Sequence, residues 1–283
     1  MRPRHPAEHL RPEEVANVSD SLPGPEFWAQ IHPHTGDVTD VQRTERGSMS
    51  DLTALVECEK GPFFVKAVRN QPGGRLDSLV REQLINPFVR PLSPELLWHS
   101  DEDAWAVLGF EVIKGRFADF TPGSADLPVI VELVNRVGRL ELPGIAADWT
   151  ETRWDRFAQN EAEAELFRGD TLLYTDINED NLLIGERVNW VVDWAWPTRG
   201  AAFIDPACLV LQLISSGHSP ESAEGWAAHC PAWANADPKS VDAFATAYVY
   251  MLRRFFERSP EAEWFGAMAR SAEEWTTHRG ISV

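Results

Sequence analysis

The sequence is poor in cysteine and contains no long apolar runs. Its three cysteines, Cys58, Cys208 and Cys230, are widely spaced among 283 residues. An odd, scattered set predicts neither a disulfide framework nor a zinc site, and it fits reduced thiols in a cytosol. No apolar run reaches the ~18 residues that span a bilayer, and no apolar stretch follows the N-terminal arginines as in a secretory signal. We therefore expect a cytoplasmic protein with no membrane partner.

Positive charge is also scarce. The chain has 44 acidic and 26 basic side chains, which gives a formal net charge of −18. Nucleic-acid binding requires a basic surface, so we expect no nucleic-acid partner. Such a charge would attract a cationic partner, and it would equally serve general solubility. Only four of the basic residues are lysines, so a lysine inside an apolar strand stands out.

The first third of the chain is rich in strand patterns. Residues 38–69 predict three short strands joined by turns. A helix is expected over 75–89, ended by Pro87 and Pro91, and a further strand begins near Trp105. The first 25 residues are polar and proline-rich, with little periodicity.

After Gly115 the pattern is mostly helical. Residues 151–168 predict an acidic helix, and residues 174–193 predict a loop followed by a β-hairpin. A strand-rich front and a helical remainder predict an α+β protein of two lobes. Three C-terminal helices are expected at about 205–216, 240–257 and 260–278.

The most informative stretch is a loop that contains Asp176 and Asn181, five positions apart. Such an aspartate can accept a proton from an attacking hydroxyl, and such an asparagine can ligate a magnesium ion. The alternative is a turn in which Asn and Asp make local backbone hydrogen bonds. The next predicted strand ends with Asp193, an oxygen ligand of the kind that a hard cation prefers.

Here the chain resembles the aminoglycoside phosphotransferase family of the protein kinase-like superfamily. YTDINEDNLLI resembles the family's His-x-Asp-x-x-x-x-Asn catalytic loop, and VVDW resembles its metal-binding Ile-Asp-Trp segment. The resemblance implies a bilobal kinase-like fold, with a small β-rich N-lobe and a larger helical C-lobe. It implies that Asp176 is the catalytic base and that Asn181 and Asp193 bind Mg²⁺.

The rest of the family's signature can be located upstream. Lys66, on the strand FFVKAV, resembles the lysine that meets the ATP phosphates, and Glu82 resembles the glutamate that pairs with it. The alternative for Lys66 is a side chain that snorkels from an edge strand. The resemblance also implies further nucleotide-binding positions, in the loop over the phosphates and in the hinge beside the base: Ser48, Met49, Ser50, Glu111 and Ile113. The implied division is an N-lobe over 1–110, a hinge over 111–115 and a C-lobe over 116–283.

The acceptor is expected to be a small molecule. Asp205 resembles the family's aspartate that braces the catalytic loop, and it follows Asp193 by only twelve positions. That spacing leaves no room for the long segment on which protein kinases bind a peptide. The sequence leaves open an aminoglycoside-like cation, suited to an acidic region with Glu151 and Asp155, and alternatives such as homoserine, choline or a macrolide.

Two departures keep other functions open. Tyr174 replaces the family's usual histidine, and Phe64 stands where kinases often have a small residue under adenine. A nucleotide-binding regulator without catalytic activity is therefore one alternative, and an interaction protein that binds no nucleotide is another. ATP or GTP as phosphate donor, and the oligomeric state, are also left open.

Overall fold

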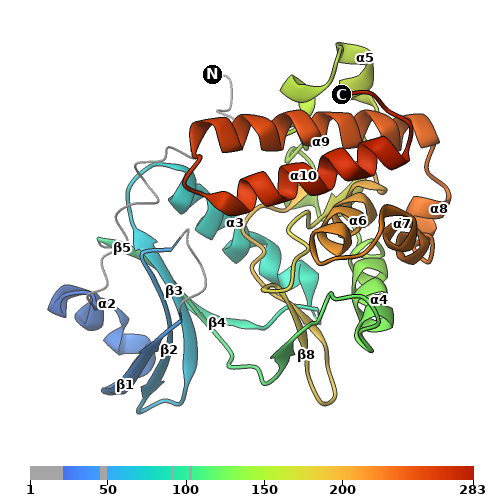
Figure 1. Cartoon of the computed structure of the whole chain (residues 1–283). Coiled ribbons are helices and arrows are strands. Elements are labelled where there is room, and N and C mark those ends of the chain that lie inside the picture. The colour runs from blue at the N-terminus through green and yellow to red at the C-terminus, as the bar shows by residue number, and fades with distance from the viewer. Residues whose placement is uncertain (1–21, 45–49, 91, 102–103) are drawn as a thin grey trace. The chain divides into compact units, whose positions relative to one another are not determined.

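The computed structural model of the chain describes residues 22–44, 50–90, 92–101 and 104–283. They form two compact units (Figure 1). The first unit contains the described residues up to Gly115 and, from much later in the chain, Val192–Ala195. The second contains Arg116–Val191 and Trp196–Val283. The predicted α+β class, with a strand-rich first part and a mostly helical second part, is confirmed.

The first unit is built on a five-stranded antiparallel sheet with the strand order β1-β2-β3-β5-β4. Its strands are β1 (Val38–Arg43), β2 (Leu52–Cys58), β3 (Phe63–Arg69), β4 (Leu96–Ser100) and β5 (Trp105–Phe110). The strands predicted between residues 38 and 69 are confirmed as β1 to β3, and the one near Trp105 as β5. Strand β4 was missed. It lies at the edge of the sheet, where Leu97 is exposed and Trp98 is buried, so its pattern is not that of a core strand.

Helix α2 (Pro25–Thr35) covers one face of this sheet. Its Phe27 and Ile31 are fully buried in a cluster that includes Val65 and Trp105. This helix was not predicted, because two buried side chains four residues apart give too little periodicity. Proline at its first position is compatible with a helix start, since that position needs no N–H.

Helix α3 (Gly74–Val89) packs on the opposite face, where Leu79 joins the cluster of Val68 and Leu108. The helix predicted over 75–89 is confirmed, with Pro87 inside its last turn rather than at its end. Pro91, the other expected stop, lies outside the described residues. Pro87 has no N–H to donate to the carbonyl four residues before it, so this turn lacks one helical hydrogen bond.

The C-terminal turn of α3 is anchored to the strand that follows it. The Asn86 side chain donates to the Pro94 carbonyl oxygen at 2.7 Å and accepts from the Leu96 N–H at 2.9 Å. Asn86 is itself buried. These two bonds hold the last turn of α3 against the segment that leads into β4.

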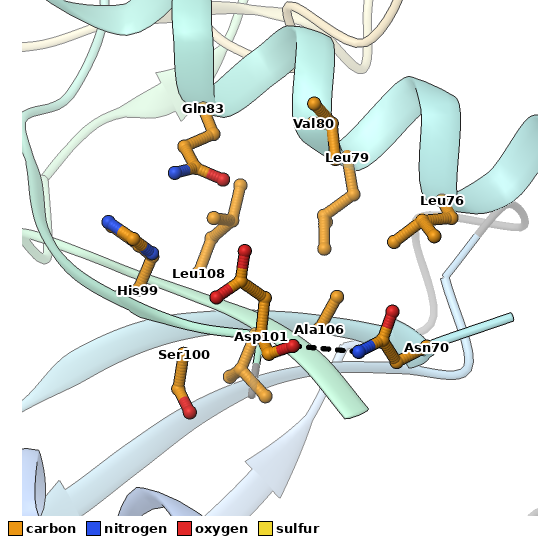
Figure 2. Close-up of a pocket in the computed structure, with 11 residues that line it drawn as sticks. Asn70, Leu76, Leu79, Val80, Gln83, His99, Ser100, Asp101, Ala106 and Leu108 are labelled. Atoms are coloured by element: carbon orange, nitrogen blue, oxygen red, sulfur yellow. Dashed lines mark hydrogen bonds between the residues drawn. The ribbon is translucent and has the colours of Figure 1, made fainter. Parts of the chain in front are cut away.

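A small pocket lies between α3 and strands β4 and β5. Its volume is about 120 Å³, and Figure 2 shows Leu79, Leu108 and the Asp101 carboxylate gathered around it. Ligand pockets are usually ~300–1,000 Å³. Among the described residues that line this pocket, none is a predicted site residue. It is too small to hold a nucleotide.

The second unit contains two small sheets and most of the helices. Strands β6, β8 and β9 form one sheet, and β7 pairs with β10 in the other. The strands are β6 (Arg116–Phe117), β7 (Thr171–Leu173), β8 (Leu182–Ile184), β9 (Trp190–Val191) and β10 (Thr198–Gly200). The helices are α4 (Leu127–Val137), α5 (Glu161–Glu165), α6 (Ile204–Ser215), α7 (Pro220–Ala227), α8 (Pro231–Ala234), α9 (Pro238–Arg258) and α10 (Glu263–His278), with 3₁₀ turns η2 (Gly144–Ala146) and η3 (Asp155–Phe157). The hairpin predicted before Asp193 is confirmed as β8 and β9.

Helices α6, α9 and α10 supply the core of the second unit, and Figure 1 shows α9 and α10 side by side. Six of their buried side chains form one cluster: Leu211, Val249, Leu252, Met268, Ala269 and Ala272. The three C-terminal helices are confirmed to within a few residues, and α7 and α8 were not predicted. No helix in the described part of the chain has the length and apolar character needed to cross a bilayer.

The acidic helix predicted over 151–168 is wrong. That stretch holds only the 3₁₀ turn η3 and the five-residue helix α5. A new helix starts at α5 because the Asn160 side chain caps it, accepting from the Glu163 N–H at 3.1 Å. Glu151 is 1% exposed, so it does not belong to a solvated acidic face.

Candidate active site

The first part of the candidate site is a lysine held between two carboxylates in the first unit. Lys66 lies on β3 and is 8% exposed. Its Nζ donates to Glu82 Oε1 at 2.8 Å and Oε2 at 3.0 Å, and to Asp193 Oδ1 at 2.8 Å. Because β3 is an interior strand of the sheet, Lys66 does not snorkel from an edge. Three distant parts of the sequence therefore meet at one ammonium group.

The charges in this cluster are unequal. Burial alone would lower the pKa of Lys66, but Asp193 and Glu82 outweigh it and hold that pKa above its ordinary value. Burial raises the pKa of Glu82, and Lys66 offsets part of the rise. With all three groups ionised, two negative charges face one positive charge. A further cation beside the cluster would be electrostatically favourable.

Asp193 is placed by an unusual backbone conformation at the end of β9. Its φ is 62°, in the left-handed region, which aspartate tolerates better than most residues. The side chain is 35% exposed, and Oδ1 is the oxygen that contacts Lys66. The Asp193 carboxylate is thus anchored on one side and accessible to solvent on the other.

The loop predicted to lie over the phosphates falls mostly outside the described residues. Ser48 and Met49 are not among them, and Ser50 is the first described residue after the gap. The adjacent Asp51 accepts from the Arg69 N–H at 2.8 Å and from Arg75 Nη1 at 2.6 Å. Asp51 thus ties the end of this loop to β3 and α3, and the nucleotide-binding role of the serines stays a prediction.

The predicted hinge residues follow β5. The Glu111 N–H donates to the Glu95 carbonyl oxygen at 2.9 Å, so its own carbonyl is the backbone group that it can offer to a base. Ile113 is half-buried. Phe64 pairs with Phe110 in the sheet and packs on the face that Lys66 shares. The roles of Glu111 and Ile113 stay predictions.

The second part of the candidate site is the loop between β7 and β8 in the second unit. Asn181 Nδ2 donates to Asp176 Oδ2 at 2.9 Å and to the Asp176 carbonyl oxygen at 3.0 Å. Asn178 Nδ2 donates to the other carboxylate oxygen, Oδ1, at 2.9 Å. Asp176 is exposed whereas Asn181 is 7% exposed. The loop therefore presents an oriented carboxylate to solvent.

Asp205, near the start of α6, braces this loop through its backbone, as the resemblance implies. Its carboxylate accepts from the Thr175 N–H at 2.7 Å and from the Tyr174 N–H at 3.1 Å. Burial raises the pKa of Asp205 to about 6, against the lowering effect of these two amides. Tyr174 is 2% exposed, so the residue that replaces the family's histidine packs in the core beneath the loop.

Sequence reasoning missed three residues of this region. Asn178 lies two positions after Asp176, a spacing typical of Asx turns, so the sequence did carry a signal for it. Arg153 and Glu151 form a buried ion pair against Thr175. No local pattern identifies that pair, because it depends on the tertiary fold.

The predicted site residues thus form two groups. Lys66, Glu82 and Asp193 come together in the first unit, and Asp176 and Asn181 in the second. Within the described ranges no cluster of three or more His, Cys, Asp or Glu side chains has metal-binding geometry. Both Asp193 and Asn181 carry oxygen atoms of the kind that a hard cation prefers, and their roles as Mg²⁺ ligands stay predictions.

Comparisons with known proteins give similarity in structure and not in sequence. No family model and no curated protein sequence matches the chain. Choline kinase LicA from Streptococcus pneumoniae is similar in structure, with a TM-score of 0.64 and 12% identity, over 89% of this chain and 98% of that chain.

Two antibiotic kinases are similar to a comparable degree. A thermostable aminoglycoside phosphotransferase APH(4)-Ia, in complex with ADP and hygromycin B, has a TM-score of 0.58 and 12% identity, over 86% of this chain and 97% of that chain. Amicoumacin kinase hAmiN, in complex with AMP-PNP, Ca²⁺ and its antibiotic, has a TM-score of 0.57 and 11% identity, over 94% and 96%. This chain therefore has the protein kinase-like fold that choline kinases and aminoglycoside phosphotransferases share.

Proposed function

We propose that this chain is an ATP-dependent phosphotransferase that moves the γ-phosphoryl group to a hydroxyl of a small molecule. The observation that carries the proposal is the buried Lys66 ammonium, held 2.8 Å from both Glu82 and Asp193. A buried charge needs partners, and a lysine fixed by a helix glutamate suits the phosphates of a nucleotide. The fold supports the same proposal, since similar structures were solved with ADP and AMP-PNP.

In this mechanism the first unit positions the donor. Lys66, oriented by Glu82, contacts the α- and β-phosphates. Asp193 and the amide oxygen of Asn181 would hold Mg²⁺, which neutralises charge on the phosphates when bound. Catalysis of this kind depends mainly on positioning and on charge neutralisation.

The second unit supplies the proton acceptor. Asn178 and Asn181 each donate to one oxygen of Asp176, so the carboxylate has a fixed direction. As the acceptor oxygen bonds to the γ-phosphorus, the bond from that phosphorus to the ADP oxygen breaks. The proton of the acceptor hydroxyl passes to Asp176.

The acceptor class is a small alcohol, and its charge stays open. Of the acidic residues first considered for a polycation, Glu151 is buried against Arg153, and Asp155 contacts Arg168 at 2.5 Å. Those two pairs weaken the case for an acidic acceptor surface in this stretch. An aminoglycoside, choline, homoserine and a macrolide all remain acceptors to be screened.

Thermal unfolding with and without Mg-ATP and Mg-GTP tests the nucleotide site. A ligand that binds only the folded protein at 100 times its Kd stabilises it by about 2.7 kcal/mol. We expect a magnesium-dependent rise in Tm for the wild type and for the control Asp180→Asn, and none for Asp193→Ala. The absence of a shift with either nucleotide at millimolar concentration would overturn the nucleotide site.

The same preparation separates an enzyme from an inactive regulator. Wild-type protein that binds Mg-ATP is incubated with each acceptor, and ADP release is followed. A regulator would show the Tm shift without turnover for any acceptor, whereas the proposed enzyme turns over with at least one alcohol. An interaction protein without a nucleotide site would show neither signal.

A further inference from the structure

A buried ion pair in the second unit reaches the loop that carries Asp176. Arg153 donates from Nε and Nη2 to both carboxylate oxygens of Glu151, which is 1% exposed. Burial alone would lower the pKa of Arg153 and raise that of Glu151. Their mutual attraction outweighs both effects, so both groups stay ionised. The Glu151 carboxylate also accepts from the Thr198 hydroxyl at 2.7 Å.

The arginine of this pair also contacts Thr175, the residue before Asp176. Arg153 Nη2 donates to Thr175 Oγ1 at 2.5 Å. The Thr175 hydroxyl donates its single hydrogen to the Tyr174 carbonyl oxygen at 2.7 Å. It can therefore only accept in its contact with Arg153. The Thr175 N–H donates to Asp205. Neighbouring groups therefore hold both the hydroxyl and the backbone N–H of Thr175.

Thr175 also has a backbone conformation that its side chain disfavours. Its φ is 64°, and among the described residues other than glycine only Asp193 shares a positive φ. A β-branched residue in this region is an outlier that persists only when its surroundings determine it. The backbone conformation of Thr175 therefore determines the orientation of the next residue, Asp176.

We propose that Arg153, fixed by Glu151, is a positioning residue that acts through the Thr175 hydroxyl to aim the Asp176 carboxylate. This inference rests on the proposed role of Asp176 as proton acceptor. The contacts run from Glu151 to Arg153 and on to Thr175, and each link is a hydrogen bond between buried or half-buried groups. A purely structural ion pair would need only Glu151, whereas Arg153 Nη2 donates to Thr175 of the catalytic loop as well as to Glu151.

Two threonines provide a matched test. Thr175→Val and Thr198→Val each remove one buried hydroxyl from the same network with little change in shape, but only Thr175→Val breaks the contact between Arg153 and the loop. Thr175→Ser keeps the hydroxyl and serves as the conservative rescue. A merely structural role predicts equal effects of the two valine variants.

Hydrogen exchange of the full-length protein measures loop position without any substrate. We expect amides of residues 174–181 to exchange at least ~10-fold faster in Thr175→Val, and at nearly wild-type rates in Thr198→Val and Thr175→Ser. Peptides from α9 and α10 report whether the fold as a whole is intact. Unchanged protection in Thr175→Val, or equal loss in the two valine variants, would overturn the proposal.

ADP release from Mg-ATP, with water or a screened alcohol as acceptor, adds the kinetic readout. Thr175→Val should lower kcat by between ~10- and 100-fold, because small misplacements of catalytic groups have effects of that size. Its KM for ATP should stay within ~3-fold of wild type, and Thr175→Ser should recover most of kcat. A normal kcat in Thr175→Val overturns the positioning role while leaving the phosphotransferase proposal intact. If wild-type protein neither binds nor hydrolyses Mg-ATP, the proposed function fails instead, and the exchange rates still decide whether Arg153 holds the loop.

Discussion

The two groups of site residues hold their aspartates in different ways. Asp193 contacts a buried cation, with Lys66 Nζ 2.8 Å from its Oδ1. Asp176 accepts hydrogen bonds from two neutral amides, those of Asn178 and Asn181, each at 2.9 Å. A cation compensates the charge of a carboxylate, whereas an amide orients the carboxylate and leaves the charge in place.

This difference matches the tasks that we propose for the two residues. A proton acceptor needs a carboxylate that is held in a fixed direction, as the two asparagine amides hold Asp176. A residue beside nucleotide phosphates needs a setting in which anions and cations alternate at short range. We therefore expect removal of Lys66 to lower the free energy of unfolding, and changes around Asp176 to lower kcat.

The largest effect is expected for Asp176→Asn, which tests the second group directly. The amide keeps the shape of the side chain but cannot accept the proton, so we expect kcat for phosphoryl transfer to fall by about 10³-fold. The Tm shift with Mg-ATP should stay near that of the wild type. Asp180→Asn, an exposed neighbour in the same loop, is the control and should retain activity. Wild-type turnover in Asp176→Asn would remove this aspartate from the mechanism.

Lys66→Met tests the first group through stability. It leaves Glu82 and Asp193 facing each other without a cation, so the free energy of unfolding should fall by about 3–5 kcal/mol. Adding Glu82→Gln should restore part of that loss, because the double variant no longer buries two uncompensated carboxylates. Chemical denaturation measures both effects, with Lys60→Met on an exposed lysine as control. A Lys66→Met protein as stable as wild type would show that the cluster does not depend on its cation.

Asp205 provides a pH test of the brace under the Asp176 loop. Burial raises its pKa to about 6 in the folded protein, from an ordinary value of about 3.9 for an aspartate. The folded state therefore holds this proton more tightly than the unfolded state, and its contribution to stability declines as pH rises from 4 to 6. A shift of this size corresponds to about 3 kcal/mol.

The Asp205→Asn variant cannot lose this proton, so it isolates the effect. Relative to wild type, its free energy of unfolding should improve by up to about 3 kcal/mol between pH 4 and pH 6, and the difference should then level off. Denaturation curves at several pH values measure this change, and other titrating groups cancel in the comparison. A difference that does not vary with pH would contradict the raised pKa.

The smallest effect is expected for Asn178→Ala. It removes one of the two neutral amides on Asp176, and an exposed hydrogen bond is worth about 1 kcal/mol, so kcat should fall by roughly fivefold. Tm should hardly change, in contrast to Lys66→Met. An Asn178→Ala protein that lost several kcal/mol of stability would show that the amides of this loop hold the fold as well as the carboxylate.

Much of the fold was predictable because its elements have strong local patterns. Periodicity and turn residues predict strands β1 to β3 and the long helices α3, α6 and α9. Helix α2 did not, because Phe27 and Ile31 acquire their role only against the sheet. The helix expected over 151–168 failed for a related reason, since burial of Glu151 against Arg153 overrides its helical composition.

The candidate site shows the same division. Lys66, Asp176 and Asp193 could be singled out because each stands in a recognisable local motif. The brace from Asp205 was expected from the resemblance. The contact of the Thr175 hydroxyl with Arg153, 22 positions earlier in the chain, could not be predicted. Spacing between residues carries no information about such a contact until the fold is known.

The first unit is discontinuous in sequence, since Val192–Ala195 belongs with residues up to Gly115. During synthesis, the Lys66 ammonium therefore lacks one of its two carboxylates until residue 193 has left the ribosome. A fragment ending at Gly115 would contain all five strands of the sheet with the buried lysine matched by Glu82 alone. Cutting the gene between the two units would thus remove a piece of the first, and supplying Val192–Ala195 on the same polypeptide would be needed to complete it.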